Sequence, residues 1–233
     1  SYVISSDNEG NNHYLNFIKM KMNQENKIAI LGGGGRTGKY IISQLLSLGY
    51  SLKVLLRNPE YFQLESPFIE ISKGDAIDPE AIRSLVQGCQ AVISTVGQRK
   101  DEPLVASQAT TNIISAMTEY GIKRYILVAG INVDTPFDKK GPETIAATEW
   151  MKMTFPTIHA DRQKTYSILS TSDVNWTLVR VPFIEFTETK DETVVSLEDC
   201  GGNKISAGAI ATFVIEQLSD DTYIRKSPFI ANV

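Results

Sequence analysis

The chain has 233 residues, of which 42% are hydrophobic and 21% are charged, and its formal net charge is −4. This composition is that of an ordinary soluble globular protein, and a weak negative charge gives no electrostatic basis for binding nucleic acid or an anionic membrane surface. No apolar run approaches the roughly 18 residues that a membrane-spanning helix needs. From the charge and the lack of such a run, we expect neither nucleic acid nor a membrane as a partner.

The two cysteines, Cys89 and Cys200, lie far apart and match no metal-binding or redox spacing. Two lone thiols indicate a reducing compartment, so we expect a cytoplasmic protein. The histidines, His13 and His159, are also only two, so we expect no histidine-based metal site. For the assembly we expect a monomer or a homodimer, working on a small molecule.

Residues 1–26 are polar and contain no apolar segment long enough for a signal peptide. Three interpretations of this leader stay open. It is a flexible segment, an additional structural element, or sequence upstream of a natural start near Met20 or Met22.

The stretch 27–48 reads as a strand, a glycine turn and a helix. Four apolar residues run from Ile28 to Leu31 without alternation, as in a parallel strand buried on both faces. Glycines at 32, 35 and 38 then lead into a helix predicted at about 37–48. Residues without a Cβ let the backbone approach a pyrophosphate, and free N–H groups at a helix N-terminus attract an anion. The stretch therefore predicts a dinucleotide site. A turn that binds nothing would leave the three-residue recurrence of glycine unexplained.

Further along the chain, strands alternate with helices, which predicts βαβ units and a parallel sheet. Strands are expected at 51–57, 69–73, 91–97, 124–130, 176–181, 193–197 and 228–231, and helices at 79–87, 104–120, 159–170 and 206–217. Asp78 is the expected N-cap of the helix that starts at Pro79. The stretch 131–157 shows no clear period and is expected to be a loop-rich region over the carboxyl ends of the strands. The prediction is one α/β domain over 27–233, a doubly wound, mostly parallel sheet with a small C-terminal substrate-side lobe; the substrate-side elements are placed at about 131–160 and 183–205.

The end of the second strand bears on the choice of dinucleotide. NAD sites usually carry an Asp or Glu there, which accepts from the ribose 2′-OH. Here the sequence reads Leu55-Leu56-Arg57-Asn58, with no acid. A guanidinium binds a 2′-phosphate through charge-assisted hydrogen bonds, and Arg36 adds a second cation. We therefore predict NADP(H) rather than NAD; the alternative is that Arg57 is only a solvated charge at a strand end.

Several stretches together resemble one known family. They are VLLRNP at 54–59, GDA at 74–76, CQAVISTVG at 89–97, GIKR at 121–124 and NWTLVRVP at 175–182. With the glycine turn, they make the chain similar to the atypical short-chain dehydrogenases/reductases, and within these to the NmrA-like group and the biliverdin IXβ reductase/flavin reductase branch. The resemblance covers about residues 27–233 and implies a Rossmann fold that binds NAD(P).

The resemblance also implies roles for individual residues along such a cofactor. The pyrophosphate would be lined by Gly32, Gly35, Arg36, Thr37 and Gly38, the 2′-phosphate by Arg57, and the adenine by Asp75 and Ala76. The nicotinamide ribose or the diphosphate would be lined by Thr95, Val96, Gly97 and Arg99, with Pro182 and Phe183 closing over the nicotinamide. On the substrate side the candidates are Ile131, Asn132 and Phe183.

The catalytic pair of the typical short-chain dehydrogenases is absent from this sequence. Those enzymes use Tyr-x-x-x-Lys, in which the tyrosine is the acid and base, and no tyrosine here is followed four residues later by lysine. Arg162 falls about where the family tyrosine sits and Tyr166 about where the lysine sits, so these two are the candidate catalytic residues. Alanine and glycine, at 129 and 130, stand at the usual serine position.

This pattern suits hydride transfer to an acceptor that needs little acid catalysis. We therefore predict an NADPH-dependent reductase of a flavin, a quinone or a similar conjugated acceptor. The alternative is a non-catalytic NADP(H)-binding redox sensor that acts through a protein partner; an NAD-dependent epimerase or dehydratase is disfavoured by the missing pair. Trp150, Met151, Met153 and Phe155 form an apolar cluster that would line an acceptor pocket, a lid or a dimer contact.

Overall fold

An eight-stranded sheet is the centre of this computed structural model, which describes residues 27–97, 104–189 and 191–233. Its strands are β1 (Lys27–Leu31), β2 (Ser51–Leu56), β3 (Ile69–Lys73), β4 (Ala91–Ser94), β5 (Arg124–Gly130), β6 (Asn175–Val181), β8 (Thr193–Ser196) and β10 (Phe229–Asn232). They lie in the order β3-β2-β1-β4-β5-β6-β10-β8, and every neighbouring pair is parallel except β10 and β8. The predicted single α/β domain with a mostly parallel sheet is confirmed. The predicted leader, 1–26, lies outside the described residues.

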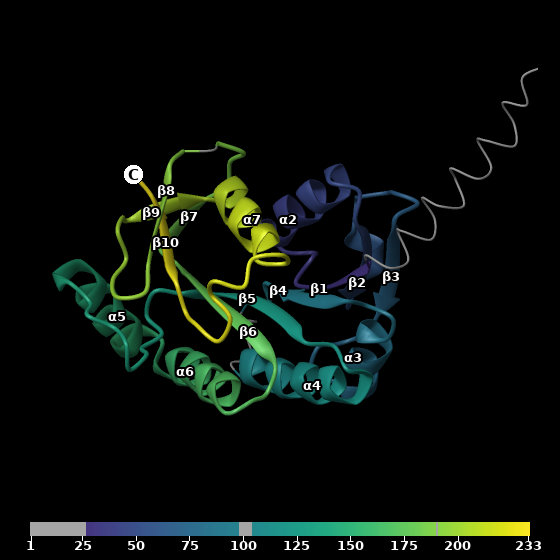
Figure 1. Cartoon of the computed structure of the whole chain (residues 1–233), viewed down its shortest axis with the longest axis horizontal. Coiled ribbons are helices and arrows are strands. Elements are labelled where there is room, and N and C mark those ends of the chain that lie inside the picture. The colour runs from purple at the N-terminus through teal and green to yellow at the C-terminus, as the bar shows by residue number, and fades with distance from the viewer. Residues whose placement is uncertain (1–26, 98–103, 190) are drawn as a thin grey trace, which may run out of the picture.

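Helices cover both sides of the sheet (Figure 1), so the inner strands β1, β4, β5 and β6 are buried on both faces, whereas the edge strands β3 and β8 are partly exposed. The helices are α2 (Arg36–Ser47), α3 (Pro79–Val86), α4 (Val105–Tyr120), α5 (Pro142–Thr154), α6 (Pro156–Ser170) and α7 (Ala207–Glu216). Helices α3, α4 and α6 contribute to one buried cluster, and α2 and α7 to the other. No helix among the described residues is long and apolar enough to cross a membrane.

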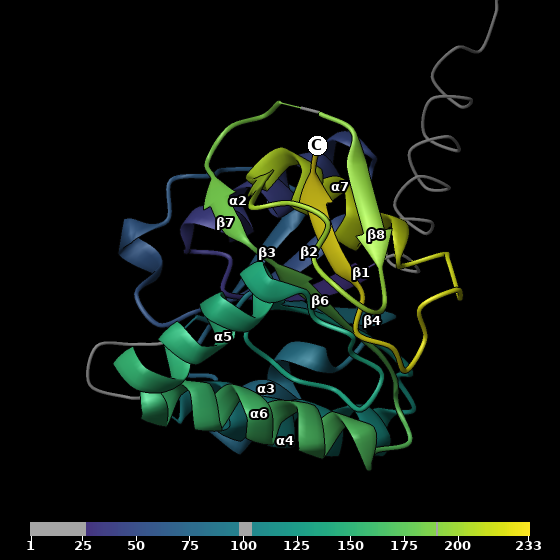
Figure 2. The same cartoon turned by 90° about the vertical axis from the view of Figure 1, so that its left-hand side faces the viewer.

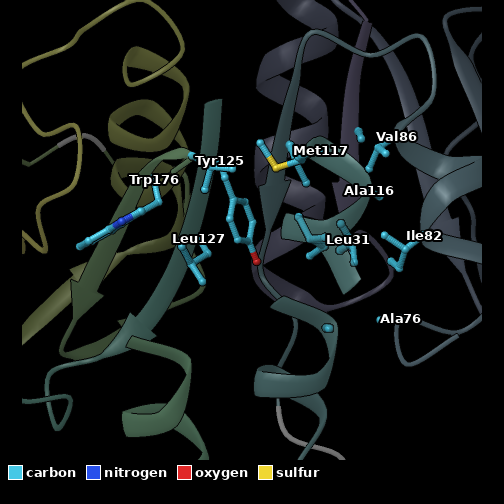
Figure 3. Packing of buried hydrophobic residues seen from close by; sticks show 14 of the residues in the cluster. Leu31, Ala76, Ile82, Val86, Ala116, Met117, Tyr125, Leu127 and Trp176 are labelled. Atoms are coloured by element: carbon cyan, nitrogen blue, oxygen red, sulfur yellow. The ribbon is translucent and has the colours of Figure 1, made fainter. Parts of the chain in front are cut away.

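Strand β1 shows how one short sequence serves both layers. Its side chains alternate between the two clusters, since Ala29 and Leu31 belong to the first and Ile28 and Ile30 to the second. Figure 3 shows the first cluster, in which Leu31 and Tyr125 from the sheet lie near Met117 of α4. An uninterrupted apolar run is therefore what this position in the sheet requires.

Two helix ends follow the sequence signals closely. The Asp78 carboxylate accepts a hydrogen bond from the Glu80 N–H at 3.0 Å and caps α3 as predicted. Gly121 ends α4 with a φ of 69°, a left-handed conformation that glycine adopts without steric cost. The beginning of α4 is capped from another helix, because the buried Asp161 of α6 accepts from the backbone N–H and the hydroxyl of Ser107.

The expectation of a loop-rich stretch at 131–157 is wrong. Helix α5 occupies residues 142–154, and α6 begins at Pro156 instead of about 159. Helix α5 was missed because it buries only Thr144 and Thr148, so its apolar residues do not gather on one face. Figure 1 shows it at one end of the molecule, to the side of the sheet, and Figure 2 shows it beside α6. The signal that was available is Pro142 at the first helical position, followed by an acidic residue.

A second, two-stranded sheet forms in the lobe predicted at about 183–205. It pairs β7 (Phe183–Glu185) in parallel with β9 (Lys204–Ser206), and both strands were too short to be recognised in the sequence. Ser206 ends β9 and then caps α7, because its hydroxyl accepts from the Ala209 N–H at 3.0 Å.

One fully buried arginine joins three segments at the outer part of the sheet. Arg180 of β6 pairs with Asp138 through two hydrogen bonds of 2.8 Å, and its exposed fraction is 0%. The same guanidinium donates to the backbone oxygens of Val133 and Ser227. Its carbon lies 3.6 Å from the ring centre of Phe229 in β10. Strand β6, the segment after β5 and the start of β10 are thereby held together.

We expect Asp138→Ala to lower the free energy of unfolding by about 3–5 kcal/mol, because it leaves the Arg180 charge buried and unpaired. Urea denaturation followed by circular dichroism measures the loss. Glu198→Ala is the matched control, since it breaks the exposed pair with Lys139 and should cost no more than about 1 kcal/mol. Equal losses in the two variants would contradict this role of Arg180.

Candidate functional site

A cleft of about 540 Å³ lies at the carboxyl ends of β1, β2 and β4, where the strand order of the sheet reverses. Open α/β sheets bind their ligands at such a point. The cleft is lined by residues from the glycine turn, the end of β2 and the end of β4. Of the predicted cofactor residues, the lining includes Gly32, Gly35, Arg36, Thr37, Arg57, Ala76, Thr95, Val96 and Gly97.

The glycine turn is built on contacts that exclude side chains. A Cβ on Gly38 would lie 2.3 Å from the Gly32 carbonyl oxygen and 2.8 Å from the Gly33 Cα. Gly32 has a φ of 78°, and the Gly35 N–H donates to its carbonyl at 3.0 Å. Gly38 is therefore buried behind the turn, where it lets α2 pack directly onto the end of β1.

This packing directs the beginning of α2 into the cleft. Gly35 is the N-cap residue and offers no side-chain hydrogen bond to the free N–H groups, and the first turn holds no acidic residue. Unsatisfied N–H groups and the helix dipole favour an anion at this position. The turn thus has the shape and the donors that a pyrophosphate needs.

The end of β4 forms the facing wall of the cleft. A Cβ on Gly32 would lie 2.6 Å from the Thr95 hydroxyl oxygen, so the two segments touch. The Thr95 N–H donates to the Leu31 carbonyl at 3.0 Å, which continues the pairing of β1 and β4 by one residue.

Three cations and two aromatic rings also line the cleft. The cations are Arg36, Arg57 and Lys39, and the rings are Tyr61 and Phe62. Lys39 and Tyr61 were not predicted, although Lys39 stands directly after the last glycine and Tyr61 follows the Asn58-Pro59 turn. Cations of this number suit a ligand with more than one phosphate.

Arg36 also has a partner outside the cleft. Its guanidinium carbon lies 3.6 Å from the ring centre of Phe186, which follows β7 in the C-terminal lobe. This cation–π contact connects the glycine turn to the lobe that the sequence predicted to be the substrate side. The contact between Arg36 and Phe186 could not be predicted from a local sequence pattern, because the two residues are far apart in the chain.

Some predicted cofactor residues do not line the cleft. The Asp75 carboxylate accepts from the Ile77 N–H at 3.1 Å and so supports the turn before α3. Pro182 is buried, and Phe183 is exposed at 75%. Arg99 lies outside the described residues.

The two candidate catalytic residues are separated by the structure. Arg162 of α6 donates from Nη1 at 3.2 Å to the carbonyl of Val96, which lines the cleft, although Arg162 itself is not among the lining residues. Burial lowers the pKa of Arg162, while the neighbouring Asp161 acts in the opposite direction. Tyr166 lies one turn further along the helix, where it contacts Trp176 edge to face at 6.0 Å and lines a different cavity.

The other polar groups near Arg162 are arranged as structural pairs. The predicted substrate residue Asn132 is buried, with Nδ2 2.9 Å from Nδ1 of His159, and Ile131 beside it is half-buried. Burial lowers the pKa of His159, which favours its neutral form. Burial raises the pKa of Tyr125 to about 12, and its hydroxyl lies 3.2 Å from that of Thr110. Neither the His159 imidazole nor the Tyr125 hydroxyl is therefore expected to donate a proton readily at neutral pH.

Comparison with known proteins agrees with this geometry. A sequence profile described as NAD(P)H-binding matches residues 32–221, and the chain therefore belongs to this NAD(P)H-binding family. Cinnamoyl-CoA reductase 1 of Petunia hybrida is 25% identical over 130 residues, which are 51% of this chain and 39% of that protein. The chain thus aligns with well under two thirds of the length of this curated relative.

Solved structures show the same fold at low sequence identity. A short-chain dehydrogenase/reductase of Veillonella parvula DSM 2008, in complex with NADP, has a TM-score of 0.75 at 15% identity and covers 88% of this chain and 94% of its own. The anaerobillin reductase ChuY of Escherichia coli O157:H7 has a TM-score of 0.74 at 16% identity, with 88% and 97% covered. The predicted short-chain dehydrogenase/reductase fold and the NAD(P)H cofactor are confirmed.

The residues present fit such a cofactor. The beginning of α2, which has no side-chain cap and no acidic residue in its first turn, can accept a pyrophosphate, and Arg36, Lys39 and Arg57 carry charge opposite to its phosphates. Among the described residues, no group of three or more His, Cys, Asp or Glu side chains is placed to hold a metal ion.

We expect Gly38→Ala to abolish measurable NADPH binding and to destabilise the fold by roughly 1–3 kcal/mol, because the new Cβ meets backbone atoms that cannot yield. Titration of NADPH fluorescence and urea denaturation measure the two effects. Gly97→Ala is the control for stability, since a Cβ there meets nothing within 4 Å. If Gly38→Ala bound NADPH as tightly as the wild type, the close contact at Gly38 would not be required for cofactor binding.

Proposed function

We propose that the protein is an NADPH-dependent reductase that transfers hydride to a flavin, a quinone or a similar conjugated acceptor. The observation that carries the proposal is Arg162, whose guanidinium stands 3.2 Å from the Val96 carbonyl on the cleft wall, in a chain without Tyr-x-x-x-Lys. The reductase names of the petunia and Escherichia coli relatives support the reaction class.

The chemistry divides between the cofactor and the chain. When bound, the cofactor supplies the hydride. The glycine turn would hold its phosphates, and Thr95 and Val96, which line the same cleft, would position its nicotinamide half. An acceptor that gains a hydride gains negative charge, and a fixed cation beside it stabilises that charge without reorganisation. Arg162 would supply this cation and has no proton to give at neutral pH, so we expect the proton to come from water.

The preference for NADPH follows from the cations on the adenosine side. Arg57 directly follows β2, at the position where an acid would select NAD, and Lys39 and Arg36 line the same cleft. A doubly charged 2′-phosphate gains charge-assisted hydrogen bonds in this environment, which a 2′-hydroxyl does not.

A second function, that of a redox sensor, has one observation in its favour. Arg36 stacks on Phe186, so a phosphate that draws Arg36 into the cleft would release the segment after β7. A sensor needs such a link between the cofactor and an outer surface. NADPH oxidation with FMN, FAD or small quinones decides between the two functions, because a sensor shows no oxidation above the background without protein.

Arg57→Ala should weaken NADPH binding roughly tenfold or more, through loss of a charge-assisted contact to the 2′-phosphate, and should leave NADH binding within about twofold. The dissociation constants of both nucleotides, measured by fluorescence titration, check this. NADH serves as the internal control for folding of the cleft. An unchanged ratio of the NADPH and NADH dissociation constants would show that Arg57 does not bind the 2′-phosphate.

Arg162→Met should lower kcat about 10- to 100-fold with FMN or a quinone as acceptor, because it removes the cation that stabilises the developing charge. Arg162→Lys should recover part of the rate, and the NADPH dissociation constant should change little in either variant. Steady-state kinetics and titration provide the measurements. If both variants keep the wild-type kcat, Arg162 has no part in the reaction.

A further inference from the structure

Tyr61 is an exposed aromatic side chain that lines the cofactor cleft. Its exposed fraction is 80%, and Arg57 and Asn58 line the cleft beside it. Among the described residues, no aromatic ring packs against it and its hydroxyl makes no hydrogen bond. Single exposed apolar side chains are common on protein surfaces and by themselves indicate nothing. The position of this ring inside a ligand cleft is the feature that points to a role.

The backbone that carries Tyr61 is anchored to the core. Residues Pro59–Tyr61 form a 3₁₀ turn, in which the Tyr61 N–H donates to the Asn58 carbonyl at 3.2 Å and the Phe62 N–H donates to the Pro59 carbonyl at 3.0 Å. Phe62, directly after the turn, is half-buried against the core cluster between the sheet and helices α2 and α7. Tyr61 therefore lines the cleft from a backbone turn that is held in place.

The order of the strands divides the cleft into two halves. The glycine turn follows β1, and the sheet continues from β1 to β4 on one side and to β2 and β3 on the other. Thr95 and Val96 line the first half, whereas Arg57, Tyr61 and Ala76 line the second. In sites of this kind the residue after β2 meets the ribose of the adenosine, and only that ribose carries a 2′-phosphate. The adenosine half of the cofactor therefore belongs beside β2 and β3, a step that rests on the NADPH site proposed above.

The second half of the cleft offers the adenine base a flat aromatic surface. Gly74 and Ala76, after β3, are small, and the Ala76 carbonyl already accepts from the Asn112 amide at 3.1 Å. Phe62 is half-buried in the core, so Tyr61 has the larger accessible ring at this end of the cleft. An aromatic ring holds a base by stacking on its face, which needs no hydrogen bond to the edge of the base.

We propose that Tyr61 is the adenine-stacking residue of this protein, whose ring covers one face of the base when the dinucleotide binds. Stacking removes apolar surface of both rings from water. The phosphates remain with the glycine turn and with Arg57. The base thereby adds to the affinity that the phosphates provide, and it distinguishes a dinucleotide from a nicotinamide mononucleotide.

The first measurement follows the base directly in full-length protein. Adenosine 2′,5′-bisphosphate carries the adenosine half of NADPH without the nicotinamide, and an aromatic ring stacked on its adenine shifts the NMR signals of the adenine ring protons upfield. We expect these shifts on binding to the wild type and to Tyr61→Phe. We expect a clear reduction in Tyr61→Leu, which keeps an apolar side chain but has no ring current.

Affinity provides the second measurement. Tyr61→Ala should weaken the binding of the bisphosphate and of NADPH at least about fivefold. Tyr61→Phe keeps the ring and should bind both within about twofold of the wild type. Reduced nicotinamide mononucleotide has no adenine, so the wild type and both variants should bind it equally.

Phe68→Ala is the matched control for these variants. Phe68 is an aromatic side chain, exposed at 47%, in the same connection between β2 and β3, and it does not line the cleft. Its replacement should leave the affinity for the bisphosphate unchanged. Neither Tyr61→Ala nor Phe68→Ala should change the melting temperature appreciably, because both side chains are exposed.

The outcomes separate this role of Tyr61 from the proposed reductase activity. Binding is measured without a hydride acceptor, so a protein that oxidises no NADPH tests the stacking equally well. If the wild type prefers NADH, the proposed NADPH preference fails, and adenosine 5′-diphosphate replaces the bisphosphate in the same comparison. The stacking role is overturned by equal upfield shifts in the wild type and Tyr61→Leu, by unchanged affinity of Tyr61→Ala, or by an equal loss of affinity for the mononucleotide.

Discussion

The contact between Gly38 and the carbonyl of Gly32 is the constraint on which the rest of the site depends. Because no Cβ separates them, α2 begins directly on the end of β1, and its free N–H groups face the cleft. Thr95 closes against the same glycine from β4, so the turn is fixed on two sides. Every other feature of the cleft is placed relative to this turn: the cations at the end of β2 and on α2, and the Val96 carbonyl to which Arg162 donates. A phosphate site of this kind is made by backbone, and the side chains around it decide which dinucleotide it accepts.

Side chains from successive turns of helix α6 reach two separate regions of the molecule. Its first turns bring Asp161 to the beginning of α4 and Arg162 to the carbonyl of Val96, behind the wall of the cofactor cleft. The next turn, with Tyr166, contacts Trp176 and lines a cavity separate from that cleft. Side chains four residues apart share a helix face but stand about 6 Å apart along its axis. That distance is enough for one to reach the cleft wall and the other to lie beyond it.

Whether an element could be predicted from the sequence depends on how that element is buried. Strands such as β1 and β5 lie between two helical layers, so their apolar runs are unmistakable, and β5 was predicted with its observed bounds. Helix α5 buries two threonines and has no apolar stripe, so periodicity could not reveal it. The cofactor residues came from a local motif, whereas the stacking of Arg36 on Phe186 and the separation of Tyr166 from Arg162 are tertiary facts. Lys39 and Tyr61 stand next to the motifs and could have been included.

The shallow attachment of α5 gives different parts of this chain different freedom to vary. A side chain at Gly38 would clash with backbone atoms, and a substitution at Asp138 would leave the buried charge of Arg180 unpaired. Few side chains are therefore compatible with either position. On α5, residues such as Trp150 and Met153 project from the surface with exposed fractions of 58% and 82%, so replacing them costs the fold little. Selection for a new partner or ligand can therefore act on this helix while the cofactor machinery stays unchanged. A single nucleotide-binding scaffold can in this way give rise to descendants with unrelated preferences.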